Sequence, residues 1–247
     1  MTRSVLRLLL FVVPAMACSA CSGSPSDWFA QRTADNAGPG NDWANLARYR
    51  AGNAALNPPA PGELRVVFMG NSITEGWVQH FPVMFPGKPY IGRGISGQTT
   101  PQMLVRFRAD VVALKPAAVV ILGGTNDIAG NTGPSTNEMI QDNIMGMTEI
   151  AMANGIRVVL SSVLPVFDYP WKPGLQPAGR IVALNAWMKA YAARVGATYL
   201  DYHSAMRDER NGLRTGLGDD GVHPNEAGYR IMAGLAEQAI QEALRRR

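Results

Sequence analysis

Short apolar runs alternate with longer amphipathic stretches through most of this chain. The runs are rich in β-branched residues and end at glycine or polar residues, which is typical of strands. The longer stretches repeat their apolar positions every three or four residues, which predicts helices. Strands are expected at residues 65–69, 90–91, 118–122, 157–160 and 198–200. Helices are expected at residues 42–49, 100–114, 135–153, 181–195 and 225–244.

This alternation predicts an α/β fold: a parallel sheet of about five strands with helices on both faces, in three α/β/α layers. Residues 118–122 (AVVIL) have no polar position, as expected of a strand covered on both faces. With 247 residues, 47% of them apolar and 17% charged, the chain can form one globular core. In such sheets, functional sites gather at the carboxyl ends of the strands.

The first residues have the layout of a secretory signal. Basic residues precede an apolar stretch at 8–13, and small residues follow it. The stretch is too short to span a bilayer, so we expect a signal peptide over residues 1–21. Cys18 and Cys21 lie at the expected processing site. Two forms stay open: a lipoprotein that touches the membrane only through its N-terminal lipid, or free release to the periplasm or the exterior.

Residues 22–62 are predicted to be a polar tether with the N-terminal helix, and residues 63–247 the folded domain. The chain carries +4, from 23 Lys+Arg and 19 Asp+Glu; without Arg3 and Arg7 the count is 21 against 19, or +2. Scattered charge of this size argues against nucleic-acid binding. Three dispersed histidines, with no cysteine in the expected mature domain, give no metal-ligand spacing, so no metal or other cofactor is expected.

Three polar segments carry the candidate chemistry: Gly70–Thr74, Gly124–Asp127 and Asp220–His223. Two of them directly follow predicted strands. Ser72 lies at a strand-to-helix turn, where a serine is either a nucleophile or the N-cap of the next helix. Taken alone the cap is the more common role, but the other two segments favour the nucleophile.

A serine nucleophile needs a base, and the chain has three histidines. His223 is the best placed, because Pro224 follows it and Asp220 lies three residues before it, where its carboxylate can orient the imidazole. Asp219 is a rival carboxylate that spacing alone does not separate from Asp220. His80 reads as a surface or packing residue. His203 is read as structural, with a substrate contact as the alternative.

Acyl transfer also needs donors for the developing oxyanion. We expect them to be the backbone N–H of Ser72, the backbone N–H of Gly94 in a glycine-rich segment, and the side-chain amide of Asn126.

The segments GNSIT, GRGISG, GGTND and DGVHP resemble the four blocks of the SGNH (GDSL-type) esterases and lipases, in the family's order. The resemblance spans residues 66–235. It implies a flavodoxin-like sheet, with Ser72 as nucleophile, His223 as base, Asp220 as its orienting partner, and an oxyanion hole from Ser72, Gly94 and Asn126. Two positions depart from the pattern: residue 71 is Asn where the family has Asp, and residue 92 is Gly where it often has Asn.

The sequence says less about the substrate than about the reaction. A proline-stiffened aromatic loop at residues 164–174 is expected to wall the cleft with Trp171, and Trp77 is expected on the opposite side. Aromatic faces beside a polar pocket suit a sugar ring, and no long apolar lid is evident. We therefore expect an exported serine esterase that removes short acyl groups, above all acetyl, from an acylated glycan or a similar small ester. The alternatives are a lysophospholipase or thioesterase for longer acyl chains, and a catalytically inactive envelope protein that binds glycans.

Overall fold

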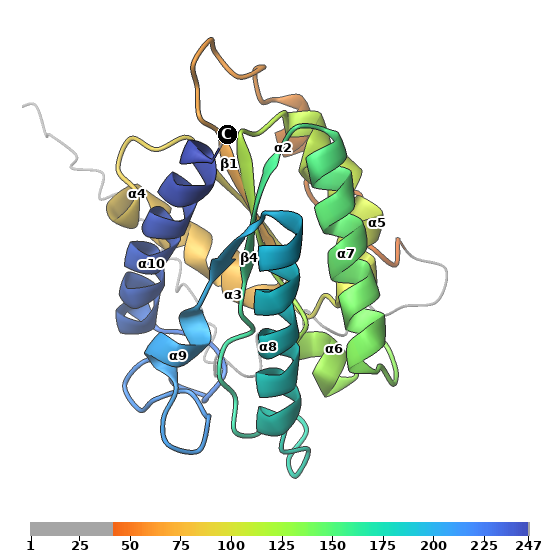
Figure 1. Ribbon diagram of the computed structural model, residues 1–247, viewed down its shortest axis with the longest axis vertical. Coiled ribbons are helices and arrows are strands. Elements are labelled where there is room, and N and C mark those ends of the chain that lie inside the picture. Colours follow the sequence, from red (N-terminus) through yellow and green to blue (C-terminus); the bar gives the residue numbers. More distant parts are fainter. Residues whose placement is uncertain (1–41, 247) are drawn as a thin grey trace, which may run out of the picture.

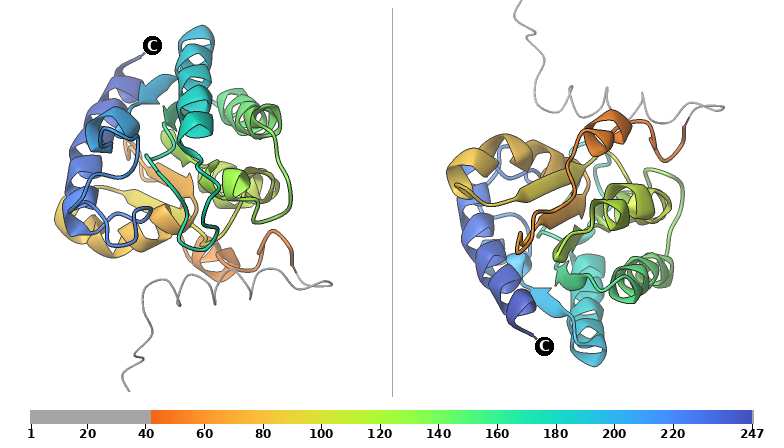
Figure 2. Two further views of the ribbon diagram at one scale, coloured as in Figure 1. Left: turned by 90° about the horizontal axis from the view of Figure 1, so that it is seen from below. Right: turned by 90° about the horizontal axis from the view of Figure 1, so that it is seen from above.

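The computed structural model describes residues 42–246, which form a parallel sheet enclosed by helices (Figure 1). All neighbouring strands run parallel, in the order β2-β1-β3-β4-β5. This confirms the predicted α/β architecture. The strands are β1 (Val66–Gly70), β2 (Tyr90–Gly94), β3 (Ala118–Leu122), β4 (Arg157–Ser161) and β5 (Thr198–Leu200). The segments that follow β3 and β5 lie at the bottom of Figure 1, and Figure 2 (left) looks onto this end.

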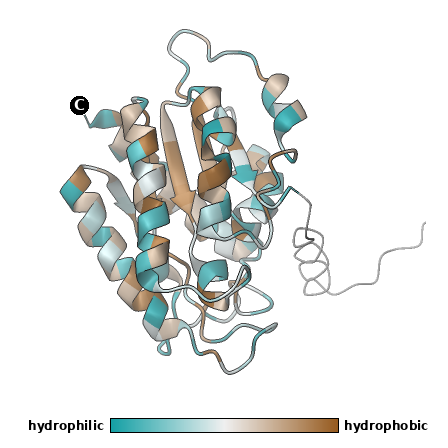
Figure 3. Ribbon diagram, turned by 90° about the vertical axis from the view of Figure 1, so that its right-hand side faces the viewer, coloured by the Kyte–Doolittle hydropathy of each residue, from teal (hydrophilic) through white to brown (hydrophobic). Residues whose placement is uncertain are grey.

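Alternate side chains of each strand enter two separate cores. In β1, Val67 and Met69 join one cluster, while Val66 and Phe68 join the other. This follows from the two-residue repeat of a strand, and it requires a helical layer on each face. Figure 3 shows the result as largely apolar strands behind helices that carry both hydrophilic and hydrophobic residues.

One face is covered by α5 (Thr100–Asp110), α7 (Asn137–Ala153) and α8 (Ala178–Val195). The other is covered by α3 (Ser72–Trp77), α4 (Phe81–Met84), α9 (Tyr202–Met206) and α10 (Glu226–Arg245). The long helices match the sequence expectation to within a few residues. Short elements such as α6 (Thr125–Ala129) were not predicted, because five residues are too few to show a helical repeat.

The N-terminal helix expected at residues 42–49 was wrong. The chain passes through turns, and the helix there is the five-residue α2 (Arg50–Ala54). Asn45 explains the difference: its φ of 52° is left-handed, so a helix cannot run through it. Asp42 accepts a hydrogen bond from the Ala47 N–H at 2.7 Å, but Ala47 lies five residues further along, whereas a helix N-cap accepts from the second or third residue after it.

The predicted signal peptide, with Cys18 and Cys21, and the first part of the tether lie outside the described residues. Within 42–246, no helix is both long and apolar enough to cross a membrane.

The end of β2 packs unusually close to α3. A Cβ added at Gly94 would lie 2.2 Å from the Glu75 nitrogen and 2.6 Å from the Asn71 oxygen, both backbone atoms. Only glycine allows this approach, because real Cβ atoms essentially never come within 3.0 Å of another heavy atom. Gly94 therefore sets the distance between β2 and the helix that begins at Ser72.

We expect Gly94→Ala to lower the free energy of unfolding by roughly 1–3 kcal/mol, because the methyl group must displace backbone rather than a flexible side chain. Gly179→Ala is the matched control: Gly179 lies in α8 with nothing within 4 Å of an added Cβ, so this change is expected to be neutral or stabilising by up to about 1 kcal/mol. Urea unfolding of both variants measures the difference. Equal stabilities would contradict the close-packing role of Gly94.

Candidate active site

The nucleophile candidate lies where β1 turns into α3. Ser72 is the first residue of α3, and Asn71 is its N-cap, accepting a hydrogen bond from the Ile73 N–H at 3.2 Å. Because Asn71 performs the capping, the Ser72 hydroxyl is available for another partner. Its Oγ lies 2.9 Å from Nε2 of His223, a residue 151 positions further along the chain.

The other imidazole nitrogen is held by Asp220. His223 Nδ1 lies 2.6 Å from Oδ2 of Asp220, while Oδ1 accepts the backbone N–H groups of His223 at 2.7 Å and Val222 at 2.9 Å. Asp219 instead lies 3.4 Å from the side-chain nitrogen of Asn225. The geometry thus separates two carboxylates that spacing alone did not distinguish, in favour of Asp220.

The environment of Asp220 keeps it ionised. Burial on its own raises the pKa of this carboxyl, but the hydrogen bonds from the His223 ring and from two backbone N–H groups outweigh burial. The net effect is a pKa below the ordinary aspartate value. A carboxylate that stays charged can hold the imidazole in one tautomer and stabilise the imidazolium.

Asn126 supplies an amide at the end of β3. It lies in α6, is buried, and donates from Nδ2 to the Gln98 carbonyl at 2.9 Å. Gln98 closes a turn after β2, with its N–H 3.3 Å from the Ile95 carbonyl, and Gly97 takes a φ of 76° within that turn. The turn is thus tied directly to Asn126.

Gly94 does not fit the expected oxyanion role. It is the last residue of β2, an edge strand, and its neighbour Ile95 donates to the Gly70 carbonyl of β1. Backbone groups of successive strand residues point to opposite sides, so the Gly94 N–H faces the outer edge. Its carbonyl on that side accepts the Tyr49 hydroxyl. Gly97, in the turn beside Asn126, was not selected as a site residue from the sequence. The feature that distinguishes it from Gly94 is its left-handed backbone, which only the structure shows.

Asp127, next to Asn126, has a separate task. Its carboxylate accepts the Thr100 N–H at 3.0 Å and the Thr100 hydroxyl at 2.5 Å, at the start of α5. Burial raises the pKa of this carboxyl above its usual value, although the Thr100 hydrogen bonds oppose the rise. The residue therefore fastens α6 to α5.

The two tryptophans expected at the cleft differ. Trp77 is only 1% exposed and stacks on Tyr229 at 5.6 Å between ring centroids. It is a core residue, and the prediction that it contacts the substrate was wrong. Trp171 is 42% exposed, with its ring 6.0 Å from the His223 ring. Its loop is anchored by Lys172, which donates to the Ala129 carbonyl at 2.7 Å.

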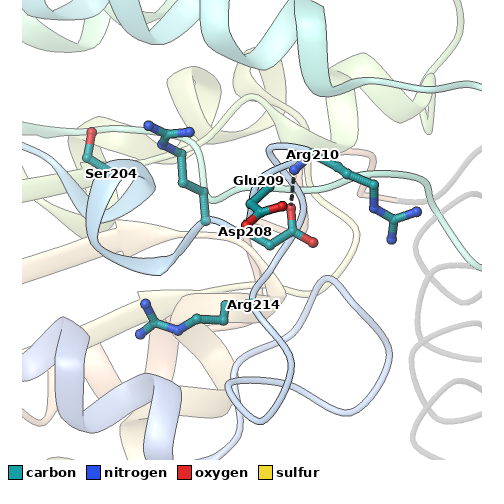
Figure 4. Close-up of a pocket in the computed structure, with 6 residues that line it drawn as sticks. Ser204, Asp208, Glu209, Arg210 and Arg214 are labelled. Carbon is teal, nitrogen blue, oxygen red and sulfur yellow. Dashed lines mark hydrogen bonds between the residues drawn. The ribbon is translucent and has the colours of Figure 1, made fainter.

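The other two histidines have different surroundings. His80 packs against the Tyr229 ring, 5.3 Å between centroids. His203 lies in α9 and lines a cavity of about 350 Å³ between α8 and α9. A second cavity, about 630 Å³, adjoins it at Ser204. Figure 4 shows this second cavity with the side chains of Arg210 and Arg214 pointing in different directions. Within residues 42–246, no group of three or more His, Cys, Asp and Glu side chains is placed to hold a metal ion.

The lowered pKa of Asp220 predicts a pH-dependent stability. The ionised carboxylate contributes stability above the ordinary aspartate pKa of about 3.9, and that contribution is lost as the pH falls through the lowered value of the folded state. The difference in melting temperature between wild type and Asp220→Asn should shrink as the pH falls below about 4. Asp219→Asn is the control. A difference unchanged down to about pH 3 would contradict the assignment.

Comparison with known proteins identifies a family and solved structures that this chain resembles. A family described as GDSL-like lipase/acylhydrolase matches residues 68–231. A GDSL-like lipase from Bacteroides thetaiotaomicron VPI-5482 has a crystal structure that covers 81% of this chain and 98% of its own, with 48% identity and a TM-score of 0.78.

Two curated proteins are more distant. An acetylxylan esterase of Xylanibacter ruminicola is 26% identical over 228 residues, covering 77% of this chain and 46% of its own. The lipoprotein YqeF of Bacillus subtilis strain 168 is 29% identical over 142 residues, covering 56% of each chain. The chain thus spans about half the length of these curated relatives. The family match at residues 68–231 alone spans more than half of the chain, and the protein belongs to the GDSL-like lipase/acylhydrolase family.

Proposed function

We propose that the protein is an exported serine esterase that hydrolyses short-chain carboxylic esters, above all acetyl esters on carbohydrates. The observation that carries the proposal is the hydrogen-bonded chain from Ser72 Oγ to His223 Nε2 at 2.9 Å and from His223 Nδ1 to Asp220 Oδ2 at 2.6 Å. A hydroxyl, an imidazole and an ionised carboxylate at these distances form a charge-stabilised base beside a nucleophile.

The reaction proceeds in two halves. Ser72 Oγ attacks the ester carbonyl carbon while its proton moves to His223 Nε2, giving a tetrahedral oxyanion and an imidazolium stabilised by Asp220. The imidazolium then gives its proton to the leaving alkoxide oxygen, so that the alcohol departs and an acyl-Ser72 ester is left. Water, deprotonated by His223, attacks this ester, and the Ser72 oxygen recovers the proton as the carboxylic acid leaves.

The oxyanion is stabilised by three donors: the Ser72 N–H, an N–H of the Asn126 amide, and the Gly97 N–H in place of the Gly94 N–H expected from sequence. Ser72 begins α3, so its N–H is free of the helical ladder. The Asn126 amide nitrogen carries two hydrogens, and its bond to Gln98 fixes the group while one hydrogen remains for the substrate. The Gly97 assignment rests on its place in the turn tied to Asn126.

The substrate class rests on two supports. A curated relative is an acetylxylan esterase, and Trp171 presents an exposed ring beside His223. An exposed aromatic face next to the catalytic base suits a sugar ring whose acetyl group reaches Ser72. Longer acyl chains, as in a lysophospholipase or thioesterase, are the alternative within the family, and glycan binding without hydrolysis is the alternative outside it.

Export is proposed from the N-terminal sequence, in which basic residues precede the apolar stretch at 8–13. The relative YqeF is a lipoprotein, which supports attachment of this chain through a lipidated cysteine, with free release as the other form.

Hydrolysis of p-nitrophenyl esters from acetate to palmitate tests the proposal. We expect the highest kcat/KM at acetate. Ser72→Ala and His223→Ala should each lower kcat/KM at least about 10³-fold, because the first variant has no nucleophile and the second has no base to activate it. His80→Ala removes a histidine outside the site and should retain activity. A maximum at long chains would favour the lipid or thioester alternative, and activity in Ser72→Ala equal to wild type would refute the nucleophile assignment.

Trp171→Ala tests the carbohydrate part. A lost ring contact of about 0.5–1.5 kcal/mol predicts a two- to tenfold higher KM for an acetylated xylo-oligosaccharide. For p-nitrophenyl acetate, which has no sugar ring, the change should be smaller. Trp187→Ala removes a tryptophan stacked on Tyr191 in α8 and is the matched control. Equal losses on both substrates would argue against a sugar platform.

A further inference from the structure

A charged side chain lies fully buried beneath the candidate site. Arg106 of α5 is 0% exposed, and its guanidinium makes four hydrogen bonds. Nη1 donates to Asp110 Oδ2 at 3.0 Å, one turn further along the helix. This partner balances the buried charge, which would otherwise be strongly unfavourable in the core.

The other bonds of Arg106 reach the ends of two strands. Nη2 donates to the Gly70 carbonyl of β1 and to the Arg93 carbonyl of β2, each at 2.9 Å. Gly70 lies two residues before Ser72. One guanidinium nitrogen therefore joins the strand that ends in the nucleophile turn to the strand that ends in the Gly97 turn.

The fourth bond reaches that turn itself. Nε of Arg106 donates to Oε1 of Gln98 at 2.5 Å, and Nε2 of Gln98 donates to the Ala44 carbonyl at 2.8 Å. Gln98 is 1% exposed, and both ends of its side-chain amide are thus occupied. Its backbone carbonyl is the acceptor that holds the Asn126 amide at 2.9 Å.

We propose that Arg106 and Gln98 are positioning residues that fix the Asn126 amide relative to Ser72. The path runs from the Gly70 carbonyl through Arg106 and Gln98 to Asn126, and every step is a hydrogen bond between buried groups. A donor for an oxyanion stabilises the transition state only if it is held where the charge develops, and a shift of 1 Å can cost about 10²-fold in rate. This inference rests on the proposed esterase function and deepens it.

A double-mutant cycle on p-nitrophenyl acetate tests the path. Gln98→Met keeps the volume but loses both side-chain hydrogen bonds, and we expect kcat to fall roughly 10- to 100-fold while KM changes less than about threefold. In an Asn126→Ala background, itself about 10²- to 10³-fold slower, the same change should cost clearly less than in the wild-type background, because the amide that it positions is already gone and only the Gly97 N–H of the same turn is left to be displaced.

Loss of a buried hydrogen bond can also weaken the fold, so a matched control is needed. Thr148→Val removes the hydrogen bond from a fully buried hydroxyl to the Ile144 carbonyl in α7, and should lower the melting temperature without changing kcat. Arg106→Lys serves as a second probe because it keeps the charge but cannot make four directed bonds. We expect it to show the same dependence on Asn126 as Gln98→Met.

The inference would be overturned if Gln98→Met and Arg106→Lys each lowered kcat by the same factor in the wild-type and the Asn126→Ala backgrounds. An unchanged kcat in the wild-type background would overturn it too. Ser72→Ala distinguishes a failure of the positioning path from a failure of the esterase proposal. If it is inactive while the cycle is additive, the positioning path alone is wrong; if it is as active as wild type, the esterase proposal fails and the positioning path with it.

Discussion

The contact between Ser72 and His223 depends on how α10 docks against α3. The two residues are 151 positions apart, so their contact requires packing between elements that are distant in the chain. Tyr229, the fourth residue of α10, donates its hydroxyl to the Ile73 carbonyl at 2.9 Å and stacks on Trp77 with an interplanar angle of 13°. These contacts hold the start of α10, and with it the loop that carries Asp220 and His223, against the helix that begins at Ser72. Trp77 thus affects the site through the core rather than through the cleft.

The sequence predicted best where one local rule decides the structure. Residues 118–122 and 198–200 were placed correctly as strands because their burial pattern is visible in the chain alone. The Ser72, Asn126 and His223 segments follow or approach strand ends, and the parallel order brings them to one edge. Spacing alone did not separate Asp220 from Asp219, since both lie within reach of His223; the family resemblance implied Asp220, and the structure places Asp220 against the His223 ring.

Two of the errors share a cause: each involved a choice between two environments that both suit the residue type. A tryptophan near a strand end fits either a cleft or a core, and for Trp77 the stack on Tyr229 decided in favour of the core. Gly94 was expected to open the backbone to a substrate, but its missing side chain instead admits α3. The helix expected at 42–49 failed at one left-handed residue, Asn45.

The N-terminal segment was expected to belong with the tether, yet from residue 42 onward it contacts the groups that surround the site. Arg48 lies 3.1 Å from Glu75, whose carboxylate also accepts the Ser96 N–H at 2.8 Å. The Trp43 carbonyl accepts from Gln102 at 2.7 Å. Such contacts pin both ends of the turn after β2, which a sequence motif within the turn could not reveal.

Two adjacent side chains of α6 complete this arrangement. Asn126 holds the Gln98 carbonyl, and Asp127 holds the N–H and hydroxyl of Thr100, two residues further along. A five-residue helix thereby fixes the exit of the turn after β2 and the start of α5 together. Hydrogen-bond donors that are held before substrate arrives need no reorganisation when the oxyanion forms, and this is where preorganised sites gain most of their rate. This rigidity opposes folding at one point: the buried carboxylate of Asp127 loses solvation, which raises its pKa. Its hydrogen bonds nevertheless hold the turn in place.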